Sequence, residues 1–264
     1  MGSLGLLSVT SCSTCPLRTG ATGRGGELNR ETRPRLTRAP APIDDRPMGL
    51  ELFFHPLASF CWKALIALYE NGTAFEPHIV DLSDPAQKAE LERLWPLCKF
   101  PVLRDHDRGR VVPEATIIIE YLAQHHPGSI ALIPKDADLA REARLRDRFY
   151  DGYVHEPMQK IVLDKLRPED KRDPYGVAQA SRLLDTAYAM IEAEMVDRKW
   201  AIGDDFTLAD CAAAPALHYA DLIHPLGEEH PQVSSYLRRL TLRPSFARVL
   251  QEAEPYFSMF PGSR

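Results

Sequence analysis

The sequence lacks a strong excess of charge of either sign, a long apolar run and a regular set of cysteines. Lys and Arg number 32 against 37 Asp and Glu, a net charge of −5, so we expect no nucleic-acid partner. No run of about 18 apolar residues occurs, so we expect no membrane span. Five cysteines, an odd number scattered along the chain, indicate a reducing cytosol and a cytoplasmic protein rather than a disulfide framework.

What the sequence does contain is ordinary for a globular protein. Hydrophobic residues make up 44% of the chain and charged residues 26%. The length of 264 residues allows one large domain or two of modest size, each with a real hydrophobic core. The chain as a whole is therefore not expected to be disordered.

The first 47 residues differ from the rest. They contain seven arginines and no lysine, and they carry +3 while the remaining 217 residues carry −8. Because they show neither helical nor alternating apolar periodicity, we predict a disordered tail or an over-extended start at 1–47. The Arg- and Ser-rich, acid-poor composition also resembles that of an organellar transit peptide, but this resemblance is weaker than the indication of a disordered tail. Cys12 and Cys15 have the spacing of a metal or redox pair, but no second pair accompanies them and we assign no metal site.

Residues 48–126 alternate between strand-like and helix-like segments. Short apolar runs bounded by Pro, Asn and Gly predict strands, and apolar residues at helical spacing predict helices. The first strand–helix–strand unit indicates a right-handed parallel crossover. The expected order is β-α-β-α-β-β-α, with strands at 50–55, 75–80, 101–103 and 111–112 and helices at 59–70, 85–94 and 114–126.

The pattern changes after residue 134, where every periodic segment is helical. Strands first and helices afterwards indicate an α+β protein of two domains. We place a linker at 127–138 and an all-helical domain at 139–257. Its expected helices are 139–166, 174–196, 207–222, 230–240 and 244–253.

The start of the first helix carries the candidate chemistry. A helix N-terminus presents unpaired N–H groups and a partial positive charge, which stabilise an anion such as a thiolate. Ser59 and Cys61 both lie on this first turn, and a serine hydroxyl can donate a hydrogen bond to a thiolate. The alternative is that Ser59 only caps the helix and that Cys61 is a small buried apolar group.

Two other positions suit a peptide-like ligand. Pro101 begins a predicted strand, where a proline either marks an edge or forms a cis bond that turns the Phe100 carbonyl towards a ligand. Glu114 opens a helix, followed by Ala115 and Thr116, and its carboxylate and the free amides could grip an ammonium and a carboxylate group. Alternatively, Glu114 only offsets the helix dipole and Thr116 is solvated.

The helical half contains one clear local motif. In Phe206-Thr207-Leu208-Ala209-Asp210, Thr207 is placed to cap a helix and Asp210 to bond back to the cap amide. We interpret this capping box as structural.

Together these segments resemble the soluble, cytosolic-type glutathione S-transferases, from residue 48 to about 261. The resemblance rests on four landmarks in order: FFHPLASFCWKALIALYENG, KFPVL, PEATIIIEYLAQHHP and WAIGDDFTLADCAAAPAL. Within that family, the sequence looks most like the serine-type and the bacterial members. It implies a thioredoxin-like domain that binds glutathione as co-substrate, a helical domain that completes the electrophile pocket, a homodimer and no metal.

The resemblance also implies roles for single residues. Pro101 falls on the family's cis-proline, with Phe100 and Val102 beside the cysteine moiety of glutathione. Glu114 falls on the acidic residue that meets the γ-glutamyl end. Ala115 stands where the family usually has a serine, so the backbone amide is kept and the hydroxyl contact is lost.

The resemblance is least regular at the thiol-activating turn. Where other members place the activating hydroxyl or the reactive thiol, this chain has Ala58, and Ser59 follows immediately. Cys61 matches the second, normally buried cysteine of a thioredoxin C-x-x-C motif. We therefore expect Ser59 to be the activator, with Cys61 as the other catalytic candidate.

The electrophile pocket is expected between this turn and the inward face of 139–166. Phe149, Tyr150 and Tyr153 are the candidates for its walls, because aromatic faces suit flat apolar substrates. The alternative is that they are core residues of a long helix.

The leading hypothesis is an enzyme that conjugates glutathione to a small hydrophobic electrophile, in detoxification or in a single catabolic step. Reversible addition to a double bond, as in an isomerase, is a close variant. The competing class is a non-catalytic binding or assembly module, which the alanines at 58 and 115 favour. A third possibility, reduction of disulfides, requires an exposed and reactive Cys61.

Overall fold

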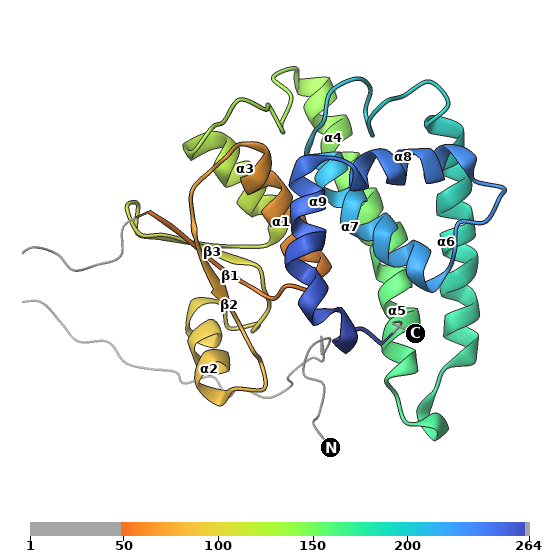
Figure 1. Ribbon diagram of the computed structural model, residues 1–264, viewed down its shortest axis with the longest axis horizontal. Coiled ribbons are helices and arrows are strands. Elements are labelled where there is room, and N and C mark those ends of the chain that lie inside the picture. The colour runs from red at the N-terminus through yellow and green to blue at the C-terminus, as the bar shows by residue number, and fades with distance from the viewer. Residues whose placement is uncertain (1–48, 262–264) are drawn as a thin grey trace, which may run out of the picture.

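The computed structural model describes residues 49–261 (Figure 1). The prediction for residues 1–47, and with it the Cys12–Cys15 pair, lies outside the described residues. Within the described range, no helix is long and apolar enough to cross a membrane.

A four-stranded mixed sheet forms the first part of the fold. Its strand order is β2-β1-β3-β4, with β1 and β2 parallel and the other pairs antiparallel. The order of strands and helices and the parallel crossover are confirmed. The elements are β1 Leu50–Phe54, α1 Ser59–Glu70, β2 Glu76–Ile79, α2 Pro85–Leu94, β3 Val102–Asp105, β4 Arg110–Pro113 and α3 Ala115–His125.

Strand β1 is buried on both faces, which is why its sequence is almost continuously apolar. Leu52 and Phe54 face the large core with α1 and α3. Phe53 faces the opposite side, where it packs with Leu91 of α2 in a smaller core. Figure 1 shows the sheet between α2 on one side and α1 with α3 on the other. The ends of β1 and β3 are thereby held rigidly beside the start of α1.

The second part is helical and packs against α1. Helix α7 lies at its centre, buried along most of its length and in contact with α1. The predicted all-helical architecture is confirmed. The helices are α4 Ala137–Phe149, α5 Glu156–Lys165, α6 Pro174–Glu194, α7 Leu208–Ile223, α8 Pro231–Thr241 and α9 Pro244–Ala253.

The segment predicted as one helix over 139–166 is interrupted. A π-helical turn, Tyr150–His155, separates α4 from α5. Pro157 stands at the start of α5 and has no N–H to donate to the carbonyl of Tyr153 in the preceding turn. A π-helical turn inserts one extra residue into the helix, and the faces of α4 and α5 are consequently out of register.

Buried contacts join the two parts. The indole of Trp62 in α1 stacks on Tyr219 of α7, with ring centroids 4.6 Å apart. The Tyr219 hydroxyl donates to the carbonyl of Leu57 over 2.8 Å. The two parts therefore meet along a packed seam, and the loop that leads into α1 is fixed from the helical side.

The start of α7 has the predicted capping box. The buried Asp210 carboxylate accepts the amide of Thr207 over 2.9 Å. It also accepts the Ala201 amide over 2.8 Å and the Tyr236 hydroxyl over 2.6 Å. Asp210 therefore ties the preceding loop and α8 to the first turn of α7.

Candidate active site

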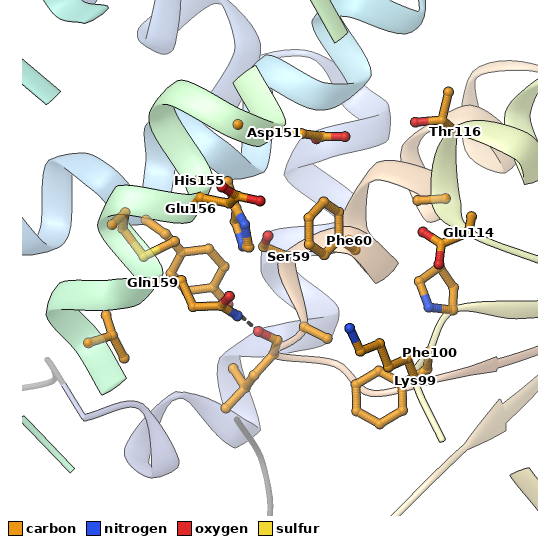
Figure 2. A pocket seen from close by; sticks show the side chains of 18 of the residues that line it. Ser59, Phe60, Lys99, Phe100, Glu114, Thr116, Asp151, His155, Glu156 and Gln159 are labelled. Atoms are coloured by element: carbon orange, nitrogen blue, oxygen red, sulfur yellow. Dashed lines mark hydrogen bonds between the residues drawn. The ribbon is translucent and has the colours of Figure 1, made fainter. Parts of the chain in front are cut away.

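A cleft of about 430 Å³ lies between the sheet and the helical part (Figure 2). Its lining comes mainly from the loop and first turn of α1, the loop before β3, the start of α3, the segment from α4 to α5 and the residues after α9. The volume is within the range of small-molecule sites. It is the place where the residues predicted to bind a ligand are brought together.

Ser59 is the first residue of α1 and lines the cleft. The interpretation of Ser59 as N-cap is wrong, because the cap position belongs to Ala58 and no side chain caps the helix. Cys61 donates the first backbone bond of the helix, to the Ala58 carbonyl over 2.8 Å. The amides of Ser59 and Phe60 precede that bond, so the turn offers a hydroxyl and helix-start amides to an anion.

The position of Cys61 does not suit a catalytic residue. Its side chain is fully buried and does not line the cleft. Burial raises the pKa of the Cys61 thiol, so the thiolate is disfavoured. The structure corrects this assignment in favour of the alternative of a small buried group, and it removes the basis for disulfide reduction at Cys61.

The loop before β3 forms one wall of the cleft. The Phe100–Pro101 peptide bond is cis, and both residues line the cleft beside Lys99. Val102 is different: its side chain is buried in the smaller core with Phe53 and does not line the cleft. Only its backbone remains available for the predicted ligand contact.

The start of α3 supplies a carboxylate. Glu114 lines the cleft and lies at the helix cap with φ 70°, in the left-handed region that non-glycine residues seldom adopt. Such backbone conformations gather at active sites, where the surrounding structure supports them. Ala115 and Thr116 follow on the cleft wall. The structure thus brings Ser59, Phe100 and the start of α3 to one cleft, as Figure 2 shows.

The three aromatic residues predicted to form the electrophile wall do not line the cleft, and this prediction is wrong. Phe149 and Tyr150 are buried in the core, and Tyr153 is 53% exposed. The π-helical turn shifts the register of the segment, so a different set of side chains faces the cleft. The polar ones are Arg148, Asp151, His155, Glu156 and Gln159, and the apolar ones are Met158 and Val162.

A buried ion cluster under the cleft was not predicted. Lys63 of α1 is 1% exposed, and its ammonium contacts the carboxylates of Asp147 and, over 2.9 Å, Asp151. Thr116 accepts from Lys63 over 2.8 Å and donates to Asp147 over 2.9 Å. Burial raises the pKa of Asp147, and Lys63 opposes that rise. A lysine within the apolar run of α1 was the available signal.

The far end of the cleft is apolar. Its walls come from the loop before α1, from α1 itself, from α5 and from the residues after α9. They include Leu57, Phe60, Met158, Val162 and Met259. A hydrophobic molecule can therefore lie beside whatever occupies the polar end.

Family models match both parts of the chain. The N-terminal domain of glutathione S-transferase matches residues 52–129, and the C-terminal domain of glutathione S-transferase matches residues 174–239. The chain belongs to the glutathione S-transferase family. The predicted family, its thioredoxin-like and helical parts, and glutathione transfer as its activity are confirmed.

Individual relatives agree with this membership. A glutathione S-transferase-like protein, LUC7, from Fusarium is 32% identical over 165 residues, which are 60% of this chain and 72% of the relative. A probable maleylacetoacetate isomerase from Caenorhabditis elegans is 26% identical over 206 residues, 77% of this chain and 94% of that protein.

A solved structure is similar as well. It is a glutathione S-transferase from Methylobacterium radiotolerans in complex with glutathione sulfonate, 30% identical, with a TM-score of 0.67. The similarity covers 76% of this chain and 93% of that one. Among residues 49–261, no group of His, Cys, Asp and Glu side chains is arranged to hold a metal ion.

Proposed function

We propose that this glutathione transferase activates glutathione at the first turn of α1, with Ser59 as the hydrogen-bond donor to the thiolate. The observation that carries the proposal is the position of Ser59. The Ser59 hydroxyl does not cap the helix, so it is free to bind a ligand. Ser59 lines the cleft at the N-terminal, positive end of α1. A hydrogen bond to a charged group contributes about 1.5–3 kcal/mol, or roughly one to two pKa units of the bound thiol.

The remaining cleft residues are proposed to orient glutathione. The Phe100 and Val102 backbones, on either side of cis Pro101, suit a peptide-like cysteine moiety. The Glu114 carboxylate suits the ammonium of the γ-glutamyl end, and the Ala115 amide its carboxylate. This orientation directs the sulfur towards Ser59 and the apolar end of the cleft.

The electrophile is proposed to be a small hydrophobic molecule bound between Phe60 and α5. The apolar residues of that end support this assignment. Irreversible conjugation and reversible addition to a double bond both start from the same thiolate. The relative named as a probable maleylacetoacetate isomerase supports reversible addition as the second candidate.

A conjugation assay with an activated aryl halide tests the role of Ser59. Ser59→Ala should lower kcat/KM at neutral pH about 10- to 100-fold and shift the pH profile upward, because less thiolate forms. Ser234→Ala, on the exposed face of α8, is the matched control and should change nothing. Full activity in Ser59→Ala would remove Ser59 as the activator. Inactivity of the unaltered protein with every electrophile would favour the non-catalytic module.

We also propose a homodimer, on the evidence of exposed apolar side chains. Glu120 of α3 and Arg144 of α4 form an ion pair that places the outward faces of the two helices side by side. Around this pair the large exposed hydrophobic residues include Ile117 and Leu145. A second copy of this chain would cover them. Leu145→Glu should convert dimer to monomer in analytical ultracentrifugation, and an unaltered protein that sediments as a monomer would contradict the proposal.

We also propose a cytoplasmic, detoxifying role. Cys61, Cys98 and Cys211, the cysteines among residues 49–261, are unpaired, which suits a reducing compartment. Cell fractionation would test the location, and increased sensitivity of a deletion strain to added electrophiles would test the role.

A further inference from the structure

His155 lines the cleft and has no role in the activation proposed above. It is the last residue of the π-helical turn, and 5% of it is exposed. π-Helical turns are rare and occur frequently at functional sites. The turn brings the His155 ring to the cleft, where the same wall carries polar side chains such as Gln159 and apolar ones such as Met158.

One nitrogen of this ring is buried without a partner. Within residues 49–261, no group forms a hydrogen bond with Nδ1 of His155. Leaving a buried polar atom unsatisfied costs about 1–3 kcal/mol, so such an atom calls for an explanation. The ring packs against Phe60, with centroids 4.4 Å apart, and Figure 2 shows it beside Ser59. Nδ1 itself is closed off, so the ring nitrogen that a ligand in the cleft can meet is the other one, Nε2.

The charge state of the ring restricts what it can do. Burial, with a smaller contribution from the Lys63 ammonium, lowers the pKa of His155 to about 4. The imidazole is therefore neutral at neutral pH and offers one N–H donor and one acceptor nitrogen. It carries no charge to attract an anion, and it is a weak base towards a thiol. The chemistry that remains is hydrogen bonding to a polar atom of the substrate, and the N–H can serve as a donor to an oxygen.

We propose that His155 donates a hydrogen bond to the carbonyl oxygen of a conjugated electrophile, so that enones and quinones are the preferred substrate class. The inference rests on the proposed function, in which glutathione thiolate forms beside Ser59. His155 packs on Phe60, the residue after Ser59, and both His155 and Ser59 line the cleft, which suits a substrate whose reactive carbon and carbonyl oxygen are only a few bonds apart. Leu57, Met158 and Val162 surround its hydrocarbon part.

The donor contributes during bond formation. The thiolate sulfur forms a bond to the β-carbon, the π pair of the carbon–carbon double bond shifts, and negative charge collects on the carbonyl oxygen. The imidazole N–H stabilises that oxygen in the manner of an oxyanion hole. A proton from solvent then reaches the α-carbon, which completes the addition. When the thiolate attacks a simple alkyl halide, no negative charge forms on a carbonyl oxygen. We therefore expect His155 not to accelerate that reaction.

Two substrates and three variants test the proposal on the full chain. The substrates are 4-phenylbut-3-en-2-one, an enone, and benzyl chloride, which has no acceptor oxygen. His155→Phe keeps the contact with Phe60 but removes the donor, whereas His155→Gln keeps a donor. His218→Phe is the matched control, because His218 is another histidine with a buried unpartnered nitrogen and a pKa lowered to about 4, and it does not line the cleft.

His155→Phe should lower kcat/KM for the enone about 10- to 100-fold and for benzyl chloride less than about threefold. His155→Gln should retain much of the enone activity, and His218→Phe should leave the ratio of the two substrates unchanged. Equal losses with both substrates, or no loss with either, would overturn the proposal. So would an unaltered protein that conjugates benzyl chloride but not the enone, whereas inactivity with both substrates would defeat the proposed function itself.

Discussion

Replacing Lys63 with methionine should destabilise the protein by about 3–5 kcal/mol, because it breaks a buried ion pair and leaves the Asp147 carboxylate with only its 3.5 Å contact to the exposed Arg148 guanidinium. Lys63 and Asp147 are 1% exposed, and the ammonium joins α1 to the helical part through Asp147, Asp151 and Thr116. For a folded part of this size, each kcal/mol lowers the melting temperature by roughly 2–4 °C. The expected decrease is therefore about 6–20 °C.

Two further variants make this prediction specific. Lys63→Met combined with Asp147→Leu replaces the pair by apolar side chains and should recover most of the lost stability, since Asp151 keeps Arg148 as a partner. Lys88→Met removes one side of the exposed Lys88–Glu92 pair and should cost no more than about 1 kcal/mol.

The assay is urea unfolding, followed by tryptophan fluorescence and by far-ultraviolet circular dichroism. Trp62 reports on the seam between the two parts because it is fully buried against Tyr219. A loss below about 1 kcal/mol in Lys63→Met would refute the reasoning. A double variant no more stable than the single one would refute it as well.

Three other outcomes are expected. Since the pKa of His155 is lowered to about 4 from an ordinary 6.5, the unfolded chain binds its proton first and stability falls as pH decreases from 6.5 towards 4. When the pH is lowered from 7 to 5, titration of this residue should reduce the free energy of unfolding, measured from urea midpoints, by roughly 2 kcal/mol. A His155→Phe variant that loses as much stability over the same pH range as the unaltered protein would contradict the assignment. Asp210→Ala should cost about 2–5 kcal/mol in the same assay, because the buried Tyr236 hydroxyl and two amides lose their acceptor; a cost under 1 kcal/mol would refute that role. Cys61 should resist alkylation in the folded protein and Cys61→Ala should keep full transferase activity, whereas rapid modification accompanied by inactivation would restore Cys61 as a catalytic candidate.

The architecture could be predicted from the sequence because local signals agree with the fold. The apolar run at the start of β1, the helical spacing in α1 and the capping box at Thr207 each report a short-range preference that tertiary packing does not override. Ser59, Pro101 and Glu114 stand at or near the ends of such elements and line one cleft, and their roles towards glutathione stay predictions.

The electrophile wall could not be predicted because it depends on the register of one helical segment. A periodic pattern assumes 3.6 residues per turn, and the π-helical turn breaks that assumption between Tyr150 and His155. Lys63 was missed for another reason. Its partners Asp147 and Asp151 are more than eighty residues away along the chain, and the packing of α1, α4 and the π-helical turn against α7 brings them together.

Activation of the glutathione thiol by Ser59 is the central claim, and the ultraviolet absorbance of bound glutathione thiolate against pH tests it most directly. The unaltered protein should bring the pKa of the thiol from about 8.5 towards neutrality, and Ser59→Ala should return it by roughly one to two units. A lowered thiol pKa that persists in Ser59→Ala would contradict the claim and would assign the activation to the backbone amides at the start of α1.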